Sequence, residues 1–235
     1  TRQLNIKYTA SLLLSITLSV APVFCHAGWG DLVDLFKETI TPASVTNNLS
    51  NDEIISGLKQ ALDKGSKVAV QSLGKENGFF SHPQLKIPMP EKLQTVETAL
   101  RKLKQDDIAD QFVLSMNRAA EKAVPKATSI FTNAIKSMSI QDAHGILKGP
   151  DNAATEYLRK NSGAEVQQAF LPIVKQATAQ VGVTEKYKML IDNLGVMSNF
   201  IDVEALDLDK YVTDKAVAGL FTMVAKEEAL IRANP

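Results

Sequence analysis

The sequence predicts an all-α protein, a single helical bundle of about eight to nine helices with an extended, proline-rich segment between helices. Apolar residues recur at three- and four-residue intervals through most of the chain, as on amphipathic helices. No run alternates apolar and polar residues over five or more positions, so we expect no significant sheet. Residues 78–93, here called the strap, cannot be helical throughout because Pro83, Pro88 and Pro90 each fix φ and lack a backbone donor.

Residues 1–27 are expected to be a cleaved secretory signal peptide. Arg2 and Lys7 precede an apolar run at residues 10–20, and Ala27 supplies a small residue for cleavage. The run is shorter than the roughly 20 residues that span a bilayer. We therefore expect an exported, periplasmic or secreted protein. Lipid attachment at Cys25 is not expected, because Phe24 stands where a lipoprotein signal would have a small residue.

Composition excludes some partner classes. Removal of 27 of the 235 residues leaves 208, with 24 Lys and Arg against 26 Asp and Glu, because Arg2 and Lys7 leave and no acid does. A net charge of about −2 is not that of a nucleic-acid-binding protein, which needs a basic face. The shortened chain also contains no cysteine, so it would depend on its core alone.

Residues 28–48 are predicted to form a short amphipathic helix and a mobile polar loop. Trp29, Leu32, Leu35 and Phe36 have helical spacing, and the loop that follows is rich in Thr, Ser and Asn. We expect this helix to dock on its own bundle, with a partner protein or a membrane surface as alternatives.

Residues 49–235 are predicted to be one all-α domain, because no linker divides them. A capping box at Ser50 and Glu53 opens a helix that ends near Gly74. Small residues recur on one face of this helix, and we expect the strap to pack there. They are Gly57, Ala61, Gly65 and Ala69.

Further helices are predicted at residues 90–103, 107–123, 127–138, 139–148, 151–160, 162–181, 184–194 and 209–233. Pro90 suits the first position of a helix, and Gly149 followed by Pro150 ends one. A second capping box at Ser162 opens the helix 162–181, which Pro172 should kink or divide. Residues 195–207 fit either a loop or a short helix.

Several motifs lie between Ser50 and the end of the chain. They are residues 78–80, 86–93, 112–121, 145–149, 154–159 and 231–235. On these motifs the chain resembles a bacterial secreted family catalogued as domain-of-unknown-function family 4197. The resemblance implies a secreted helical protein and assigns no activity.

The best polar constellation is Asn117, Arg118 and Glu121 on the predicted helix 107–123. Residues three and four apart are neighbours on a helix, so these side chains should lie together. In one interpretation they anchor a polar head group or carboxylate, with Arg118 as a bidentate donor. In the other they form an ordinary surface pair or a buried network that ties down free carbonyl groups of the strap.

The strap contributes the other candidate residues for a ligand or partner: Phe79, Phe80, His82, Ile87 and Met89. We expect Phe80, Ile87 and Met89 to be buried and His82 to be a loop histidine. Together with other apolar side chains they would either line a cavity between helices or be plain core. Only His82 and His144 remain after cleavage, so we expect no metal site, and no motif indicates a catalytic residue or a cofactor.

The hypothesis from sequence is a non-catalytic binding protein of the bacterial envelope. Its ligand would be an apolar small molecule or lipid, or its partner an envelope protein. One alternative is an enzyme of unknown reaction that uses Asn117, Arg118 and Glu121. Another is a structural envelope protein that acts through its N-terminal helix.

Overall fold

The structure is a computed structural model that describes residues 50–180, 182–192 and 207–233. The predicted signal peptide, the predicted amphipathic helix and nearly all of residues 195–207 lie outside these ranges. Within the described ranges all regular structure is helical and there is no strand, which confirms the predicted all-α fold for this part of the chain.

The elements in chain order are α2 (Asn51–Gly74), the 3₁₀-helix η1 (Glu91–Leu93), α3 (Gln94–Lys102), α4 (Asp106–Ala123), the 3₁₀-helix η2 (Val124–Lys126), α5 (Ala127–Lys136), α6 (Ile140–Lys148), α7 (Ala153–Gln180), α8 (Val183–Asp192) and α9 (Leu208–Ala233). The predicted helix starts at Ser50 and Ser139 are confirmed, since both residues form complete capping boxes. Pro125 lies in η2 and continues the chain from α4 into α5 without a loop.

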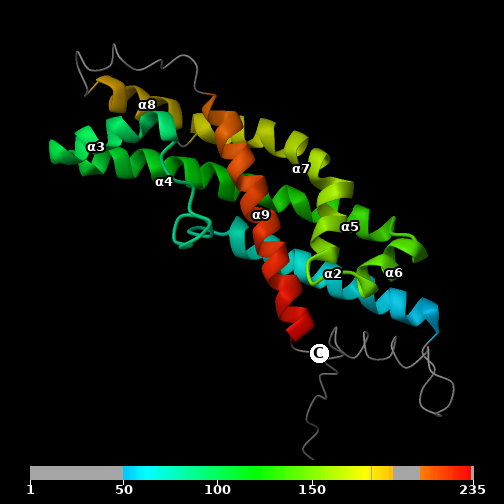
Figure 1. Ribbon diagram of the computed structural model, residues 1–235. Coiled ribbons are helices and arrows are strands. Elements are labelled where there is room, and N and C mark those ends of the chain that lie inside the picture. The colour runs from blue at the N-terminus through cyan, green and yellow to red at the C-terminus, as the bar shows by residue number, and fades with distance from the viewer. Residues whose placement is uncertain (1–49, 181, 193–206, 234–235) are drawn as a thin grey trace, which may run out of the picture.

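The helices form an elongated bundle that α9 crosses obliquely (Figure 1). α9 contacts α7, α4 and α2 and so ties together elements from both halves of the sequence. α3 and α8 pack on α4 at one end of the bundle, whereas α5 and α6 lie at the other end (Figure 1).

Aromatic side chains from four helices and the strap fill the core. Fully buried phenylalanines come from the strap, α4, α5, α7 and α9, and they are Phe79, Phe112, Phe131, Phe170 and Phe221. The rings of Phe131 and Phe221 meet at a centroid distance of 5.6 Å with a tilt of 58°. This geometry is favourable for an aromatic pair and joins α5 to α9 inside the core.

The predicted division between the helices 151–160 and 162–181 is wrong, because α7 runs without a break from Ala153 to Gln180. Ser162 does not cap a helix. It is 2% exposed, and its hydroxyl donates to the carbonyl of Leu158, four residues earlier, at 2.5 Å. With this bond the serine hydroxyl has a hydrogen-bond partner within the helix, so the residue can be buried there. Ser162 lies between Leu158 and Val166 on the face of α7 that is buried in the core. Pro172 likewise lies inside α7 and does not divide it.

The strap is extended only in its second half, which corrects the expectation of an extended segment throughout. The backbone N–H of Ser81 donates to the carbonyl of Asn77, and that of Lys86 to the carbonyl of His82, so the chain turns repeatedly before it straightens at residues 86–90. Proline excludes a helix but leaves tight turns open, and the sequence could not separate turns from extended chain.

The small-residue face of α2 receives α9 and not the strap at Gly65. A Cβ atom on Gly65 would lie 3.0 Å from Cδ1 of Ile231, so the missing side chain is what lets α9 approach. The strap instead packs across α4 and α9. Phe79 lies against Gly219, and the Tyr211 hydroxyl donates to the carbonyl of Pro88 at 3.1 Å.

Candidate functional site

Asn117 of α4 holds the extended half of the strap. Its Oδ1 accepts from the backbone N–H of Ile87 at 2.8 Å, and its Nδ2 donates to the carbonyl of Ile87 at 2.9 Å and to that of Val113 at 2.8 Å. The side chain is fully buried, and both amide protons and the carbonyl oxygen have partners. The carboxamide therefore takes the place of a neighbouring strand for one residue of the strap.

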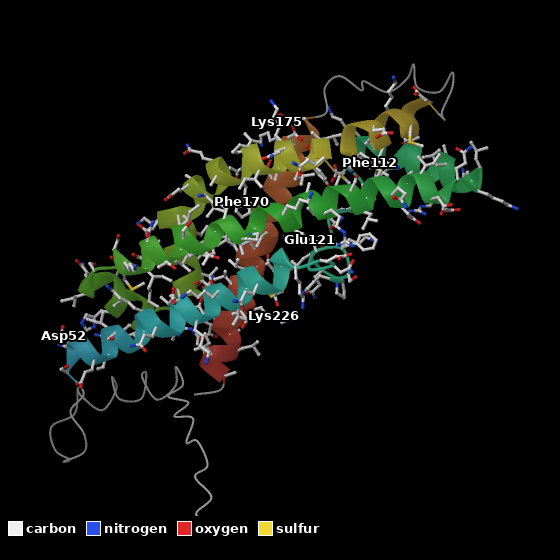
Figure 2. The ribbon with its side chains drawn as sticks, turned by 180° about the vertical axis from the view of Figure 1, so that it is seen from behind. Asp52, Phe112, Glu121, Phe170, Lys175 and Lys226 are labelled. Atoms are coloured by element: carbon white, nitrogen blue, oxygen red, sulfur yellow. The ribbon has the colours of Figure 1, made fainter. Side chains whose placement is uncertain are left out.

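Glu121 holds the turning half of the strap, one helical turn further along α4 (Figure 2). Its Oε1 accepts from the backbone N–H groups of Phe79 and Phe80 at 3.0 and 3.2 Å. Its Oε2 accepts from Nη1 of Arg118 at 2.7 Å. The carboxylate is thus buried but paired and hydrogen-bonded on both oxygens, which offsets its desolvation.

Arg118 is occupied by the protein itself. Beyond its contact with Glu121, its Nη2 donates to Oε1 of Glu76 at 3.1 Å and to Oδ1 of Asn77 at 2.9 Å. Asn77 has a positive φ of 64°, so this bond supports the strained turn that leads out of α2. The guanidinium links Glu121 to the turn at Glu76 and Asn77. Both of its terminal nitrogens are engaged in these bonds, so it is not available as a bidentate donor to a ligand.

The remaining strap candidates divide into core and surface. Phe79, Ile87 and Met89 are buried, at 0%, 1% and 3% exposure, and belong to the core. Phe80 is only half-buried, so the expectation that it would be buried is wrong.

The half-buried ring of Phe80 lies close to two cations. The ammonium of Lys86 is 4.4 Å from the ring centroid, and the guanidinium of Arg118 is 6.0 Å from it. Cation–π contacts of this kind are favourable even where the ring is partly exposed to solvent. His82 is a loop histidine whose Nδ1 accepts from the backbone N–H of Gln84 at 3.3 Å.

Tyr211 adds a third attachment for the strap. Burial raises the pKa of its hydroxyl, and the negative charge of Glu91 raises that pKa further. The neutral phenol is therefore the favoured form, and it is the form that can donate to the carbonyl of Pro88. Asn117, Glu121 and Tyr211 together explain how a proline-rich segment is held in place on helices.

A second buried network, which the sequence did not predict, centres on Glu228 of α9. The carboxylate accepts from the backbone N–H groups of Ala154 and Thr155 at 3.0 and 2.8 Å and from the Thr155 hydroxyl at 2.7 Å. Arg232 donates to the same carboxylate from Nε and Nη2 at 3.1 and 2.9 Å, and to the carbonyl of Ile146 at 3.3 Å. Glu228 thus supplies a negative charge to the free N–H groups at the start of α7.

The sequence carried only a partial signal for this network. Glu228 and Arg232 are four residues apart and so predict a helical ion pair, but an exposed pair of that kind is common on any helix. The pair differs from an exposed one because Glu228 also accepts from backbone N–H groups at the start of α7, more than 70 residues earlier in the chain. Only the folded structure brings the two together.

An open groove lies between α2 and α5, here called the α2–α5 groove. It is lined by residues of α2 between Asp52 and Lys67, by Thr132, Ile135 and Lys136 of α5, and by Ile140 of α6, and its volume is about 690 Å³. Ile55 and Ile135 form the buried floor, whereas Ile140 is 58% exposed at the edge. Lys59 donates to the backbone carbonyl of Lys136, and Lys67 pairs with Asp63.

The hollow that the described residues form in the interior is far smaller. It lies between α2, α7 and α9, beside Gly65 and Glu228, and holds about 10 Å³, which is no more than one water molecule needs. Among the described residues there is also no cluster of three His, Cys, Asp or Glu side chains that would hold a metal ion. The α2–α5 groove is therefore the better candidate for a binding site.

The folded arrangement defines an all-α protein whose two buried carboxylates hold its own backbone. The chain belongs to the family described as protein of unknown function DUF4197, whose model matches residues 48–235. No curated protein and no solved structure matches the chain. In the part of the chain that the structure describes, no helix has both the length and the apolar character needed to cross a membrane.

Proposed function

We propose that this protein is an exported, non-catalytic binding protein of the bacterial envelope, and that it binds an envelope protein partner in the α2–α5 groove. The observation that carries the proposal is the groove itself, with its apolar floor of Ile55 and Ile135 and an exposed Ile140 at its edge. The exposed side chain extends the apolar floor into one contiguous apolar surface, and a groove with such a surface, rimmed by polar residues, is typical of an interaction site.

The shape and charge of the groove favour a helix of a partner protein over a small apolar ligand. Its α2 wall runs over 16 residues, from Asp52 to Lys67, and is about 22 Å long. Lys59 and Lys136 form no salt bridge with any described residue, so an incoming helix with acidic residues beside its apolar face would be complemented. A lipid or other apolar molecule inside the bundle has less support, because the hollow that the described residues form between α2, α7 and α9 is too small for one.

The alternative of an enzyme has no geometric support at Asn117, Arg118 and Glu121. The polar atoms of these side chains hold the strap and the turn after α2. Groups that are engaged in holding backbone are not free to bind or transform a substrate.

The test is cross-linking in the cell followed by binding with purified proteins. A photoreactive amino acid at Ile140 is compared with the same amino acid at Leu103, which is similarly exposed at 62% but directly follows α3, at the other end of the bundle from α5 and α6. We expect one envelope protein to be cross-linked from position 140 and not from position 103. The cross-linked protein is then purified and its affinity for the wild-type chain is measured.

Two matched substitutions make the binding measurement decisive. Ile140→Asp places a charge at the groove edge and should weaken binding at least tenfold, whereas Leu103→Asp should leave it unchanged. Equal affinity of the Ile140→Asp and wild-type chains would refute the proposal, as would a cross-link that forms only to lipid.

A further inference from the structure

We propose that Asn77 and Gly78 form a spontaneous modification site, where folding slows deamidation of Asn77 and where the isoaspartate that deamidation produces loosens the strap. Glycine follows asparagine here and nowhere else in the chain. This pair of residues is especially reactive, because glycine has no Cβ to hinder attack of its backbone nitrogen on the neighbouring side chain. The proposal concerns the strap and does not depend on the α2–α5 groove.

The reaction needs only the chain and water. The backbone nitrogen of Gly78 loses its proton to solvent and bonds to Cγ of Asn77, and Nδ2 of Asn77 leaves as ammonia. Water then adds to either carbonyl of the resulting succinimide ring and breaks one of its C–N bonds. Opening at one carbonyl gives aspartate. Opening at the other gives isoaspartate, in which the main chain runs through Cβ and Cγ and is one carbon atom longer.

The folded turn engages both reacting groups. The backbone N–H of Gly78 donates to the carbonyl of Lys75 at 3.0 Å, and Oδ1 of Asn77 accepts from Nη2 of Arg118 at 2.9 Å. Gly78 is buried, whereas Asn77 is exposed. The attack has to break the first of these bonds and turn the side chain away from the second, so it requires local opening of the turn. Folding should therefore slow the reaction.

The turn has no room for a longer main chain. A Cβ atom on Gly78 would lie 2.5 Å from the carbonyl oxygen of Leu73. Both sides of the turn are fixed, since Leu73 and Phe79 are fully buried. The next two N–H groups, those of Phe79 and Phe80, donate to Glu121. An added main-chain carbon atom displaces these groups, so isoaspartate should break the hold of the buried carboxylate on the strap.

Aspartate at position 77 is the less disruptive product. It leaves the length of the main chain unchanged and keeps an acceptor for Arg118, now with a charge opposite to that of the guanidinium. Aspartate, like asparagine, tolerates the positive φ of 64° at this position. The substitution Asn77→Asp therefore separates the effect of the new charge from that of the longer main chain.

The first measurement compares the reaction in folded and unfolded protein. The full chain is incubated at mildly alkaline pH with and without guanidinium chloride, and deamidation is followed by mass spectrometry of the peptide that contains Asn77. Asn152, which is exposed and precedes alanine, is the internal control. We expect Asn77 to react at least about tenfold faster in the unfolded chain, and Asn152 to stay unmodified over the same time. Equal rates for Asn77 in folded and unfolded protein would overturn the protection by the turn.

The second measurement tests the effect on the strap. Protein that was deamidated in guanidinium chloride is refolded, and its isoaspartate form is isolated by chromatography and identified with an isoaspartate-specific methyltransferase. This form should fail to refold or melt at least about 5 °C below unreacted protein taken through the same unfolding and refolding, whereas Asn77→Asp should melt within about 2 °C of it. The loosening would be refuted by an isoaspartate form that melts with the unreacted protein, or by an Asn77→Asp variant that melts as low as the isoaspartate form.

Discussion

Asn117 and Ile87 exchange a closed pair of hydrogen bonds, from the backbone N–H of Ile87 to Oδ1 and from Nδ2 to the carbonyl of Ile87. The buried carboxamide on α4 bonds both the backbone N–H and the carbonyl of Ile87, as a residue of a neighbouring β-strand would. Glu121 repeats this role for Phe79 and Phe80. The strap is therefore held through its backbone by polar side chains as well as through its apolar side chains.

Asn117→Asp should destabilise the fold by about 3 kcal/mol or more. The aspartate keeps the acceptor for Ile87 but loses both donors, and it places a negative charge against the carbonyls of Ile87 and Val113. Urea unfolding measures the change. Asn133→Asp on the exposed face of α5 is the control and should change the unfolding free energy by no more than about 0.5 kcal/mol.

Ile87→Asp should also destabilise the protein by several kcal/mol, about 3 or more, because Ile87 is 1% exposed and the new charge has no partner. Thermal unfolding followed by circular dichroism checks this. Gln84→Asp, at an exposed position of the strap, should melt with the wild type. An unchanged melting temperature for Ile87→Asp would show that the strap does not belong to the core.

Glu228→Gln should cost about 2–4 kcal/mol, although the side chain keeps its size. The amide removes the negative charge at the start of α7, and its N–H₂ group would face the donors of Ala154, Thr155 or Arg232. Chemical denaturation gives the value. The matched change Glu156→Gln removes an exposed charge from the first turn of the same helix together with its pair with Arg159, and it should cost less than about 1 kcal/mol.

Gly219→Ala should destabilise the protein by about 1–3 kcal/mol, despite the higher helix propensity of alanine. A Cβ at this position would lie 2.7 Å from Cε1 of Phe79, and that ring is fully buried and cannot move aside freely. Gly145→Ala in α6 meets no atom within 4 Å and should stabilise by about 0.5–1 kcal/mol. Differential scanning calorimetry of the two variants should show melting shifts of opposite sign.

Stability should fall at alkaline pH through Tyr211. Its pKa is raised in the folded state, so the native phenol keeps its proton in a range where the unfolded one, with a pKa of about 10, has lost it. This contribution is complete below pH about 10 and disappears as pH rises towards the folded pKa.

The measurement is urea unfolding between pH 8 and 11. Tyr211→Phe should lose stability less steeply with pH than the wild type does. Tyr157→Phe, which removes a second tyrosine whose burial raises its pKa, separates the two contributions. Parallel pH profiles of wild type and Tyr211→Phe would contradict the assignment.

Local sequence patterns predict the structure correctly where interactions between residues within one helical turn determine it. Ser50 with Glu53 and Ser139 with Asp142 cap helices because both partners lie within one turn. The same kind of signal failed at Ser162, because the apolar face of α7 continues through that residue into the core and outweighs a local cap. Gly65 shows a related limit, since spacing indicates a close approach but does not identify the neighbour.

By itself, the sequence determined the all-α class, the interruption by the strap and the proximity of Asn117, Arg118 and Glu121 on one helix, since helical period, proline chemistry and spacing are local properties. Only the tertiary structure decided what these residues hold and that Glu228 meets the start of α7. For the residues that the structure describes, it also decided that the larger open space lies in the α2–α5 groove and not in the hollow between α2, α7 and α9. These contacts join residues from 30 to more than 70 positions apart, and their partners are backbone groups that every residue carries.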